Sequence, residues 1–319
     1  MAPYVSIVIP IYNEEANIEQ LWARLSKVLK ESFDGKGWEV VMTDDGSRDK
    51  SLEMILEIAH AEPRVKVVEF NRNYGQHSAI FAAFAQVEGR IVITMDADLQ
   101  NPPEEIPNLV AKMEEGFDVV GGWRQGRGRN DSIFRTLPSK IVNAMTRKTT
   151  GVRLNDYGCM LRAYSREVVE SMLQCRERSS FIPALANSFA KRITEIPVAH
   201  AERAAGDSKY GLWRLINLQF DLLTSFSLLP LQMLSVLGVA IASLGFLLFI
   251  GLMIYRFLDP EGTVGGVFTL FAILFFFVGC QFIAFGLLGE YIGRIYVEVR
   301  DRPKYIIKKI HSKTRVCSH

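Results

Sequence analysis

Two aspartates separated by one residue, Asp96 and Asp98, directly follow the short apolar segment Ile91 to Met95. Side chains alternate between the two faces of a strand, but a turn at the strand end can bring both carboxylates to one side. Carboxylate oxygens suit Mg²⁺ or Mn²⁺, and such ions also bind substrate phosphates. Gln100 is close enough to help form the same site. These residues therefore predict a divalent-metal site beside a phosphate-bearing substrate.

An isolated pair of acids is weak support for a site, because acidic pairs are common on protein surfaces. Here, however, polar clusters follow three other apolar segments as well. They are Tyr12-Asn13-Glu14, Asp44-Asp45-Gly46-Ser47 and Asn71-Arg72-Asn73. Four such clusters in one chain favour an active site built from the ends of several strands.

The cluster Asp44 to Ser47 has two interpretations. In the first it is only a turn from a strand to a helix, with Gly46 at the tight bend and Ser47 capping the helix. In the second, a carboxylate of the cluster also accepts hydrogen bonds from a nucleobase or a ribose. The chain contains neither a GxGxxG nor a Walker sequence, so dinucleotide and P-loop sites lack support.

The elements that must position these clusters alternate along the chain. The expected strands are Val5–Ile9, Glu39–Thr43, Val65–Phe70 and Ile91–Met95, and the expected helices are Glu15–Leu29, Asp49–Ala59 and Ser78–Gln86. Such alternation predicts an α/β fold with a parallel sheet and helices on both faces. Ligands of such sheets bind at the carboxyl ends of the strands, where the polar clusters lie. The glycine- and arginine-rich stretch 121–129 is expected to be a mobile loop suited to an anion.

Composition narrows the class of protein. The chain has 319 residues and a formal net charge of only +2, so bulk charge gives no support for a nucleic-acid partner. The four cysteines are scattered without CxxC spacing, which argues against a disulfide framework or a zinc site. The N-terminal sequence lacks the basic-then-apolar pattern of a secretory signal, so we expect the first domain to be cytoplasmic.

Two long apolar blocks occupy the last third of the chain, at Leu228–Tyr255 and Val267–Leu288. Each exceeds the roughly 20 residues that cross a bilayer as a helix. The connecting loop is not basic, whereas the segment after Leu288 is rich in lysine and arginine. The positive-inside rule therefore predicts two transmembrane helices, an external loop and a cytoplasmic tail.

The segment before the first block places Trp213, Ile216, Phe220 and Leu223 near one helical face, as in a helix lying in the membrane interface. The expected organisation is a catalytic domain over 1–209, an amphipathic helix over 210–227, two transmembrane helices over 228–288 and a basic tail over 289–319. Within the tail, the run Lys304 to Lys309 is expected to contact either anionic lipid or the soluble domain.

At this point the motifs resemble a known family. Ile9 to Glu14, Asp44 to Ser47 and Asp96 to Asp98 are together similar to the family-two glycosyltransferases, which have the GT-A (Rossmann-like) fold. Asn71 to His77 and Asp96 to Pro103 resemble the branch that acts on polyprenyl phosphates. Three further segments look like the members that transfer 4-deoxy-4-formamido-L-arabinose to undecaprenyl phosphate in lipid A modification and polymyxin resistance: Asp156 to Tyr164, Glu177 to Pro183 and Gly289 to Tyr296. The resemblance covers nearly the whole chain.

The resemblance implies a role for each matching residue. The UDP-sugar donor is expected to contact Pro10, Tyr12, Glu14, Asp44, Asp45, Gln76 and Asp96, with Arg124 and Arg127 closing over its diphosphate. Asp98 and Gln100 are expected to hold Mg²⁺ or Mn²⁺, with Asp96 at the metal or the nucleotide. The catalytic residues are expected to be Asp98 and Asp156. The lipid phosphate is expected to bind Arg203, Ser208, Lys209 and Tyr210.

The implied chemistry sets the demand on these groups. The acceptor is a phosphate monoester whose second pKa is about 6, so it is mostly a dianion near neutral pH. It needs little help from a base, and Asp156 is expected either to act as a base or to orient the acceptor and stabilise positive charge on the sugar ring. Charge on the departing diphosphate is then the main catalytic problem. A single in-line displacement predicts inversion at the anomeric carbon.

Several alternatives remain at this stage. The sugar could instead be glucose, mannose or N-acetylglucosamine. A processive polysaccharide synthase is less favoured, because the chain lacks a QxxRW-like motif and two spans make no obvious channel. A membrane-tethered nucleotide-binding scaffold without turnover is the alternative from another class. The family further implies a homotetramer in the bacterial inner membrane with its catalytic domain facing the cytoplasm.

Overall fold

The computed structural model describes residues 2–124, 159–175, 182–199, 229–258, 266–299 and 303–312. The chain forms two compact units, one of Met1–Tyr210 with Arg302–His319 and one of Gly211–Asp301. Several residues singled out in the sequence lie outside the described ranges: Arg127, Asp156, Arg203, Ser208, Lys209 and Tyr210, together with the amphipathic segment 210–227.

The first unit is built on an eight-stranded sheet of order β7-β5-β6-β4-β1-β2-β3-β8. Its strands are β1 (Val5–Ile11), β2 (Trp38–Asp44), β3 (Val65–Phe70), β4 (Ile91–Thr94), β5 (Val119–Arg124), β6 (Arg162–Ser165), β7 (Ile193–Val198) and β8 (Ile307–His311). The first four strands occur within a residue or two of the predicted positions and pair in parallel, as expected.

The sheet as a whole is mixed, which corrects the expectation of a parallel sheet. Strand β6 is inserted antiparallel between β4 and β5, and β8 adds antiparallel to the edge formed by β3. Strand-helix alternation specifies direction only for consecutive strands joined by a crossover. The direction of a strand that joins the sheet later depends on where the chain returns, which the local pattern does not encode.

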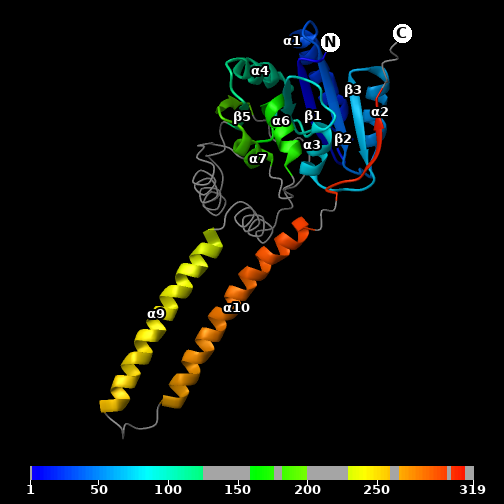
Figure 1. Ribbon diagram of the computed structural model, residues 1–319. Helices are drawn as coiled ribbons and strands as arrows, with labels where there is room; N and C mark the ends of the chain where they lie inside the picture. The colour runs from blue at the N-terminus through cyan, green and yellow to red at the C-terminus, as the bar shows by residue number, and fades with distance from the viewer. Residues whose placement is uncertain are drawn as a thin grey trace. The chain divides into compact units, whose positions relative to one another are not determined.

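Helices cover both faces of the sheet, as predicted (Figure 1). On one face lie α1 (Ile18–Phe33), α2 (Ser51–Ala61) and α4 (Ile106–Glu114), the last preceded by the 3₁₀ turn η1 (Pro103–Glu105). On the other lie α3 (Gln76–Phe84), α6 (Arg166–Gln174) and α7 (Ile182–Phe189). The alternation of β1 explains the two cores, since Ile7 and Ile9 pack in the first and Val8 in the second.

The glycine-rich stretch after Asp118 is only partly described, and its described part is not a loop. Residues 121–124 form the end of β5, paired with β6 and β7. A Cβ atom at Gly122 would lie 2.9 Å from the Val198 side chain and 3.0 Å from the Leu161 carbonyl oxygen. Gly122 is therefore required by close packing of neighbouring strands, a use of glycine that sequence alone does not separate from a turn.

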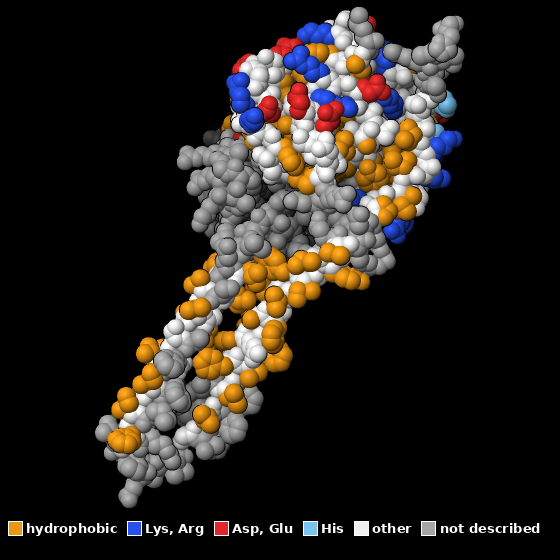
Figure 2. Space-filling model, viewed as in Figure 1, with side chains coloured by type: hydrophobic (Ala, Val, Ile, Leu, Met, Phe, Trp, Pro, Cys, Tyr) orange, Lys and Arg blue, Asp and Glu red, His pale blue; other side chains and the backbone are white. Residues whose placement is uncertain are grey.

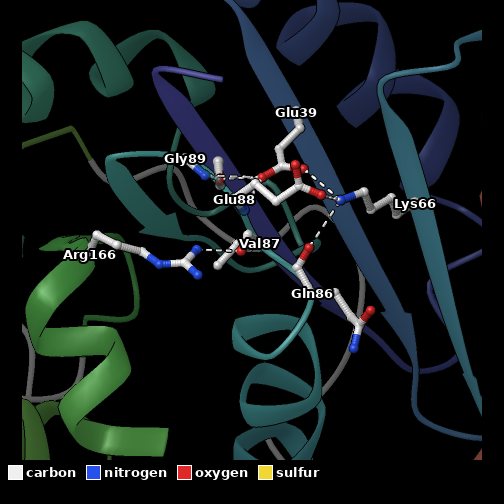
Figure 3. Close-up of polar contacts among 8 residues, drawn as sticks. Glu39, Lys66, Gln86, Val87, Glu88, Gly89 and Arg166 are labelled. Atoms are coloured by element: carbon white, nitrogen blue, oxygen red, sulfur yellow. Dashed lines mark hydrogen bonds and ion pairs between the residues drawn. The ribbon is translucent and has the colours of Figure 1, made fainter. Parts of the chain in front are cut away.

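The turn from α3 to β4 is fastened by a buried polar network around Glu39, shown in Figure 3. The Glu39 carboxylate is 5 % exposed and accepts hydrogen bonds from the backbone N–H groups of Glu88 and Gly89. It also accepts one of 2.6 Å from the Ser6 hydroxyl and pairs with Lys66 at 3.1 Å. The network lies at the start of β1 and β2, opposite the polar strand ends, and fixes how α3 is connected to β4.

The second unit contains two long helices, α9 (Leu229–Leu258) and α10 (Gly266–Val299), which lie side by side (Figure 1). A Cβ at Gly245 of α9 would lie 3.0 Å from the ring of Phe277 in α10. Among the described residues, one stretch is long and apolar enough to cross a membrane, Phe276–Gly293 in α10; the apolar stretch Val236–Gly245 in α9 is shorter. Of the two predicted transmembrane helices, α10 therefore has support from its described residues, and the described residues of α9 do not reach the required length of apolar sequence.

Apolar side chains of both helices are exposed, as Figure 2 shows along their length. Val239 and Leu244 in α9 are 67 % and 68 % exposed, and Phe282 and Ile283 in α10 are each 70 % exposed. Contiguous exposed apolar surface of this kind marks contact with lipid or with another protein.

The C-terminal strand β8 returns to the first unit and packs on its sheet. The ring of Tyr305 stacks on Phe70 with centroids 5.1 Å apart, and the Asn71 N–H donates to the Ile306 carbonyl oxygen at 3.4 Å. Lys308 donates to the Glu69 carboxylate at 2.5 Å. Of the two interpretations of the basic tail, packing on the soluble domain is thus the one found for Ile307–His311.

Candidate active site

The polar clusters meet at one edge of the sheet, where β1, β2, β3 and β4 end. In the β1–β2 pairing Ile11 is the partner of Asp44, and in the β2–β3 pairing Asp44 is the partner of Glu69. The segments that follow these strands are therefore neighbours, as the sequence predicted.

The loop after β1 is tied to the loop after β2 by backbone-to-side-chain hydrogen bonds. The Asn13 N–H donates to the Ser47 hydroxyl at 3.1 Å, and the Arg48 N–H donates to the Asn13 side-chain oxygen at 2.8 Å. The Glu14 N–H donates to the Ser51 hydroxyl at 2.8 Å. Asn13 has a φ of 54°, a left-handed conformation that asparagine tolerates. These contacts fix the backbone from which Tyr12 and Glu14 project.

Pro10, Tyr12 and Asp44 lie next to one another across the ends of β1 and β2. Tyr12 is 43 % exposed, so its ring is available to a ligand, whereas Asp44 is 1 % exposed. Burial raises the pKa of Asp44 above its usual range, and the neighbouring Glu69 carboxylate adds to this, while hydrogen bonds from Ser47 oppose it. An aromatic ring beside a buried acceptor is an arrangement that suits a nucleobase.

Asp45 is also buried, with 2 % exposure, but its carboxylate is already occupied by the protein. One oxygen accepts a hydrogen bond of 2.6 Å from the Tyr74 N–H and the other accepts one of 2.9 Å from the Gly75 N–H. Gly46 follows with a φ of +69°, and a Cβ there would lie 2.5 Å from the Arg72 backbone. The β2–α2 turn therefore packs directly against the segment that leads into α3.

Asp96 receives a side-chain hydrogen bond from Gln76, the first residue of α3. The Gln76 amide nitrogen lies 2.6 Å from the Asp96 carboxylate. The pKa of Asp96 is raised to about 7, mainly by burial and also by the negative charges of Asp98 and Glu14. The Gln76 hydrogen bond and the positive charge of Arg124, at the end of β5, act in the opposite direction. The Asp96 carboxylate is thus affected by two acids, one amide and one arginine: Asp98, Glu14, Gln76 and Arg124.

The chain turns sharply after Asp96, as it must if both acids are to face one side. Strand β4 ends at Thr94, and Leu99 has a φ of 62°, in the left-handed region that leucine rarely adopts. The Gln100 N–H donates to the Asp98 carboxylate at 3.1 Å and closes the turn. A strained backbone position of this kind is typical of functional sites.

The chemistry of these groups fits a divalent cation in part. The negative charge of Asp98 raises the pKa of Asp96, as expected for neighbouring carboxylates, and hard oxygen ligands suit Mg²⁺ or Mn²⁺. Within the part of the chain that the structure describes, no group of three or more His, Cys, Asp or Glu side chains could hold a metal ion. The described residues would supply two carboxylates, a number that suits ions that also bind substrate phosphates.

One residue near the site, Glu69, was not singled out from the sequence, whereas its partner Lys308 lies in the run Lys304–Lys309, for which contact with the soluble domain was one of two expectations. Glu69 in β3 is 7 % exposed and faces Asp44, and it is paired with Lys308 from the C-terminal strand. The only available signal for Glu69 was a glutamate in the mostly apolar segment Val65–Phe70, which also carries Lys66. Its partner lies 239 residues further along the chain, beyond the reach of local patterns.

The chain was compared with known proteins. Residues 6–173, more than half of the chain, match the family described as Glycosyl transferase family 2. The chain belongs to glycosyltransferase family 2. Its mixed sheet, in which the parallel strands β1 to β4 have polar ends, is covered by helices on both faces and is the GT-A-like domain of this family. The protein is a glycosyltransferase.

Curated relatives within the family match along nearly the entire chain. An undecaprenyl-phosphate 4-deoxy-4-formamido-L-arabinose transferase from Shewanella sediminis is 57 % identical over 310 residues, covering 96 % of this chain and 92 % of that protein. The enzyme of the same name from Proteus mirabilis is 56 % identical over 308 residues, covering 96 % and 93 %. The sequence resemblance to this branch is thereby confirmed.

Among solved structures, glucosyl-3-phosphoglycerate synthase from Mycobacterium tuberculosis, in complex with phosphoglyceric acid, superposes with a TM-score of 0.50. The two proteins are 22 % identical, and the match covers 70 % of this chain and 80 % of the other. At this identity the likeness concerns the fold alone.

Proposed function

We propose that this glycosyltransferase transfers 4-deoxy-4-formamido-L-arabinose from a UDP donor to undecaprenyl phosphate, for lipid A modification and polymyxin resistance. The observation that carries the proposal is the identity of 57 % to a curated transferase of that name, extending over 96 % of the chain. Because the match covers nearly the whole chain, it includes the region after Leu228 as well as the catalytic domain.

For the donor, we assign the uridine to the ends of β1 and β2. Tyr12 is the exposed ring, Asp44 the buried acceptor, and Pro10 and Glu14 flank them. The diphosphate would then extend toward Asp96, where Arg124 supplies positive charge. Arg127 is assigned to the same diphosphate from sequence resemblance.

Asp96 and Asp98, helped by Gln100, would hold one Mg²⁺ or Mn²⁺ ion. When bound, that ion neutralises negative charge on the departing diphosphate. Asp96 and Asp98 provide its carboxylate oxygens, and Gln76 holds the Asp96 carboxylate in place through its amide.

For the acceptor, we assign Asp156 to the sugar and Arg203, Ser208, Lys209 and Tyr210 to the lipid phosphate, from the family resemblance. The acceptor phosphate is already a dianion near neutral pH, so it attacks the anomeric carbon without first losing a proton. Asp156 then orients the acceptor and stabilises positive charge on the ring. One displacement gives inverted stereochemistry and no covalent sugar-enzyme intermediate.

We further propose that α9 and α10 both cross the bacterial inner membrane and that the catalytic domain faces the cytoplasm, where the donor is found. The exposed apolar side chains of both helices and the basic sequence after Leu288 support this orientation. A homotetramer is proposed from family resemblance.

The test is UDP release by the purified full-length protein with undecaprenyl phosphate, a divalent metal and a panel of UDP-sugars. We expect release that requires both the lipid and the metal, with the formamido-arabinose donor preferred over glucose and N-acetylglucosamine. Preference for another sugar would replace the donor in the proposal. Nucleotide binding without release would favour a scaffold without turnover.

The stereochemistry is tested on the product of the same reaction. The anomeric configuration of the sugar-lipid, determined by NMR, should be opposite to that of the donor. Retention of configuration, or a sugar trapped covalently on Asp156, would rule out a single displacement.

A further inference from the structure

We propose that Asp45 is a positioning residue that fixes the N-terminus of α3 and thereby holds Gln76 against Asp96, rather than a ligand of the donor. The inference deepens the proposed function. It rests on that function only where the rate of sugar transfer is the measured quantity. It differs from the role that sequence resemblance gives Asp45, which is contact with the UDP-sugar.

The Asp45 carboxylate lies at the start of α3 and binds the backbone there. Asp45 directly follows β2. Its two carboxylate oxygens accept hydrogen bonds from the backbone N–H groups of the consecutive residues Tyr74 and Gly75. Helix α3 begins at the next residue, Gln76, and no side chain of the preceding Gly75 can cap it. Of the backbone N–H groups left unpaired at the start of a helix, Asp45, from another loop, accepts a hydrogen bond from that of the cap residue Gly75, and its negative charge suits the helix dipole.

Gln76 connects the segment that Asp45 holds to Asp96. Gln76 is covalently next to the two residues that Asp45 holds, and its amide donates to Asp96 at 2.6 Å. A shift of the 74–75 backbone would move Gln76 with it, because a helix begins there and transmits the displacement as a rigid element. Asp45 and Asp96 are thus linked through one short segment, although they follow different strands.

The turn at Gly46 packs closely against the backbone of Arg72 and Asn73. A Cβ at Gly46 would lie 2.5 Å from the carbonyl carbon of Arg72 and 2.7 Å from the nitrogen of Asn73. The turn after Asp45 therefore presses against the same segment that its carboxylate holds. On its far side, the segment contacts the C-terminal strand through Asn71 and Ile306.

The carboxylate is poorly placed to be a donor ligand. It is 2 % exposed, and each oxygen already has a short hydrogen bond to a backbone N–H. A ligand that took over either oxygen would leave a buried backbone donor without an acceptor, which is unfavourable. Asp44 is also buried, but its two oxygens share one backbone donor, the Ser47 N–H, at 3.3 Å each. This long, shared hydrogen bond leaves these oxygens more acceptor capacity than those of Asp45, so Asp44 is the acceptor assigned to the uridine.

The experiment compares Asp45→Asn with Asp44→Asn in the full-length protein. Three quantities are measured: amide hydrogen exchange in the peptide covering 71–80, affinity for UMP without added metal, and kcat for transfer. For Asp45→Asn we expect exchange in 71–80 to be faster by about tenfold and kcat to fall about tenfold, with UMP affinity changed by less than about twofold. For Asp44→Asn we expect weaker UMP binding and unchanged exchange in 71–80.

A double-mutant cycle tests whether Asp45 acts through Gln76. If it does, Asp45→Asn should lower kcat little further once Gln76→Ala is present, because the contact it supports is already gone. Additive losses would overturn the inference. So would Asp45→Asn weakening UMP binding as strongly as Asp44→Asn while leaving exchange in 71–80 unchanged.

Gly46→Ala provides a variant that keeps both carboxylates, in case Asp45→Asn does not fold. It should likewise speed exchange in 71–80, since the added methyl group displaces the segment. Gly35→Ala is its matched control, because a Cβ at Gly35 meets no atom within 4 Å. Unchanged exchange in Gly46→Ala would also count against the inference. Amide exchange is informative even if the transfer reaction itself is not observed, so the two proposals fail separately.

Discussion

The side-chain amide of Gln76 donates a 2.6 Å hydrogen bond to the carboxylate of Asp96, joining the start of α3 to the end of β4. Asp96 is the most strongly perturbed acid of the candidate site, with its pKa raised to about 7 by burial and by Asp98. A neutral donor at this position orients the carboxylate without neutralising its charge. The site therefore depends on the relative placement of a helix and a strand that are joined by the Glu39-supported turn.

Replacing Gln76 with Ala should lower kcat/KM for transfer by about tenfold, the effect of losing one hydrogen bond to a charged group. The protein should fold normally, because the Gln76 side chain is exposed. Steady-state kinetics with the UDP-sugar donor measure the effect. Gln20→Ala, at an exposed position of α1, is the matched control and should be indistinguishable from the unmodified protein. Equal rates for the two variants would show that the contact is dispensable.

Replacing Asp98 with Asn should abolish metal-dependent transfer, because the amide cannot supply the second negatively charged oxygen ligand. UDP release in the presence of undecaprenyl phosphate and a titrated metal measures this. Glu53→Gln, which removes an acid at an exposed position of α2, serves as the control for loss of one charge. Near-normal turnover by Asp98→Asn would remove Asp98 from the metal site.

The attachment of β8 should weaken in acid because of Glu69. Burial alone would raise the pKa of Glu69, but hydrogen bonds from Lys308 and His311 outweigh it, and the net shift is downward from 4.5. A carboxyl group with a lowered pKa in the folded state stabilises the fold above its unfolded pKa. That contribution is lost as the pH falls through the lower, folded value.

We therefore expect the thermal unfolding midpoint of Glu69→Gln to lie below that of the unmodified protein at pH 7, with the difference shrinking as the pH falls below about 4.5. Lys308→Gln should behave similarly. Lys309→Gln is the matched control: its backbone is the β3–β8 ladder partner of Glu69, but its exposed side chain makes no hydrogen bond or ion pair with the Glu69 carboxylate among the described contacts. A difference that does not depend on pH would show that the charge of Glu69 is not involved.

Replacing Glu39 with Ala should destabilise the protein by about 3 kcal/mol, since it leaves buried donors of the α3–β4 turn without their acceptor. Glu39→Gln should cost less, because it keeps one acceptor oxygen for the N–H groups of Glu88 and Gly89. Denaturant unfolding of the full-length protein in detergent gives both values. Glu53→Ala, at an exposed helix position, should change stability by less than about 0.5 kcal/mol. A similarly small effect at Glu39 would contradict a supporting role for the network.

Much of the catalytic fold could be read from local patterns. The strands β1 to β4 and helices α1 to α3 were predicted nearly in place, because hydrophobic residues repeat with the period of each element. The polar strand ends also predicted where the site lies, since parallel strands place their carboxyl ends at one edge. The predicted loop over 121–129 was wrong at its start, because glycine serves close packing at Gly122 as well as turns.

The sequence by itself determined the fold class, the family, and the edge of the sheet at which the predicted polar clusters meet. Only the tertiary structure decided that β6 and β8 run antiparallel, that the Asp45 carboxylate is occupied by the Tyr74 and Gly75 backbone, and that Gln76 reaches Asp96. The physical reason is the separation along the chain over which each effect acts. Periodicity and turn chemistry act between residues a few positions apart, whereas strand direction and the partner of a buried oxygen depend on contacts between segments that meet only after folding.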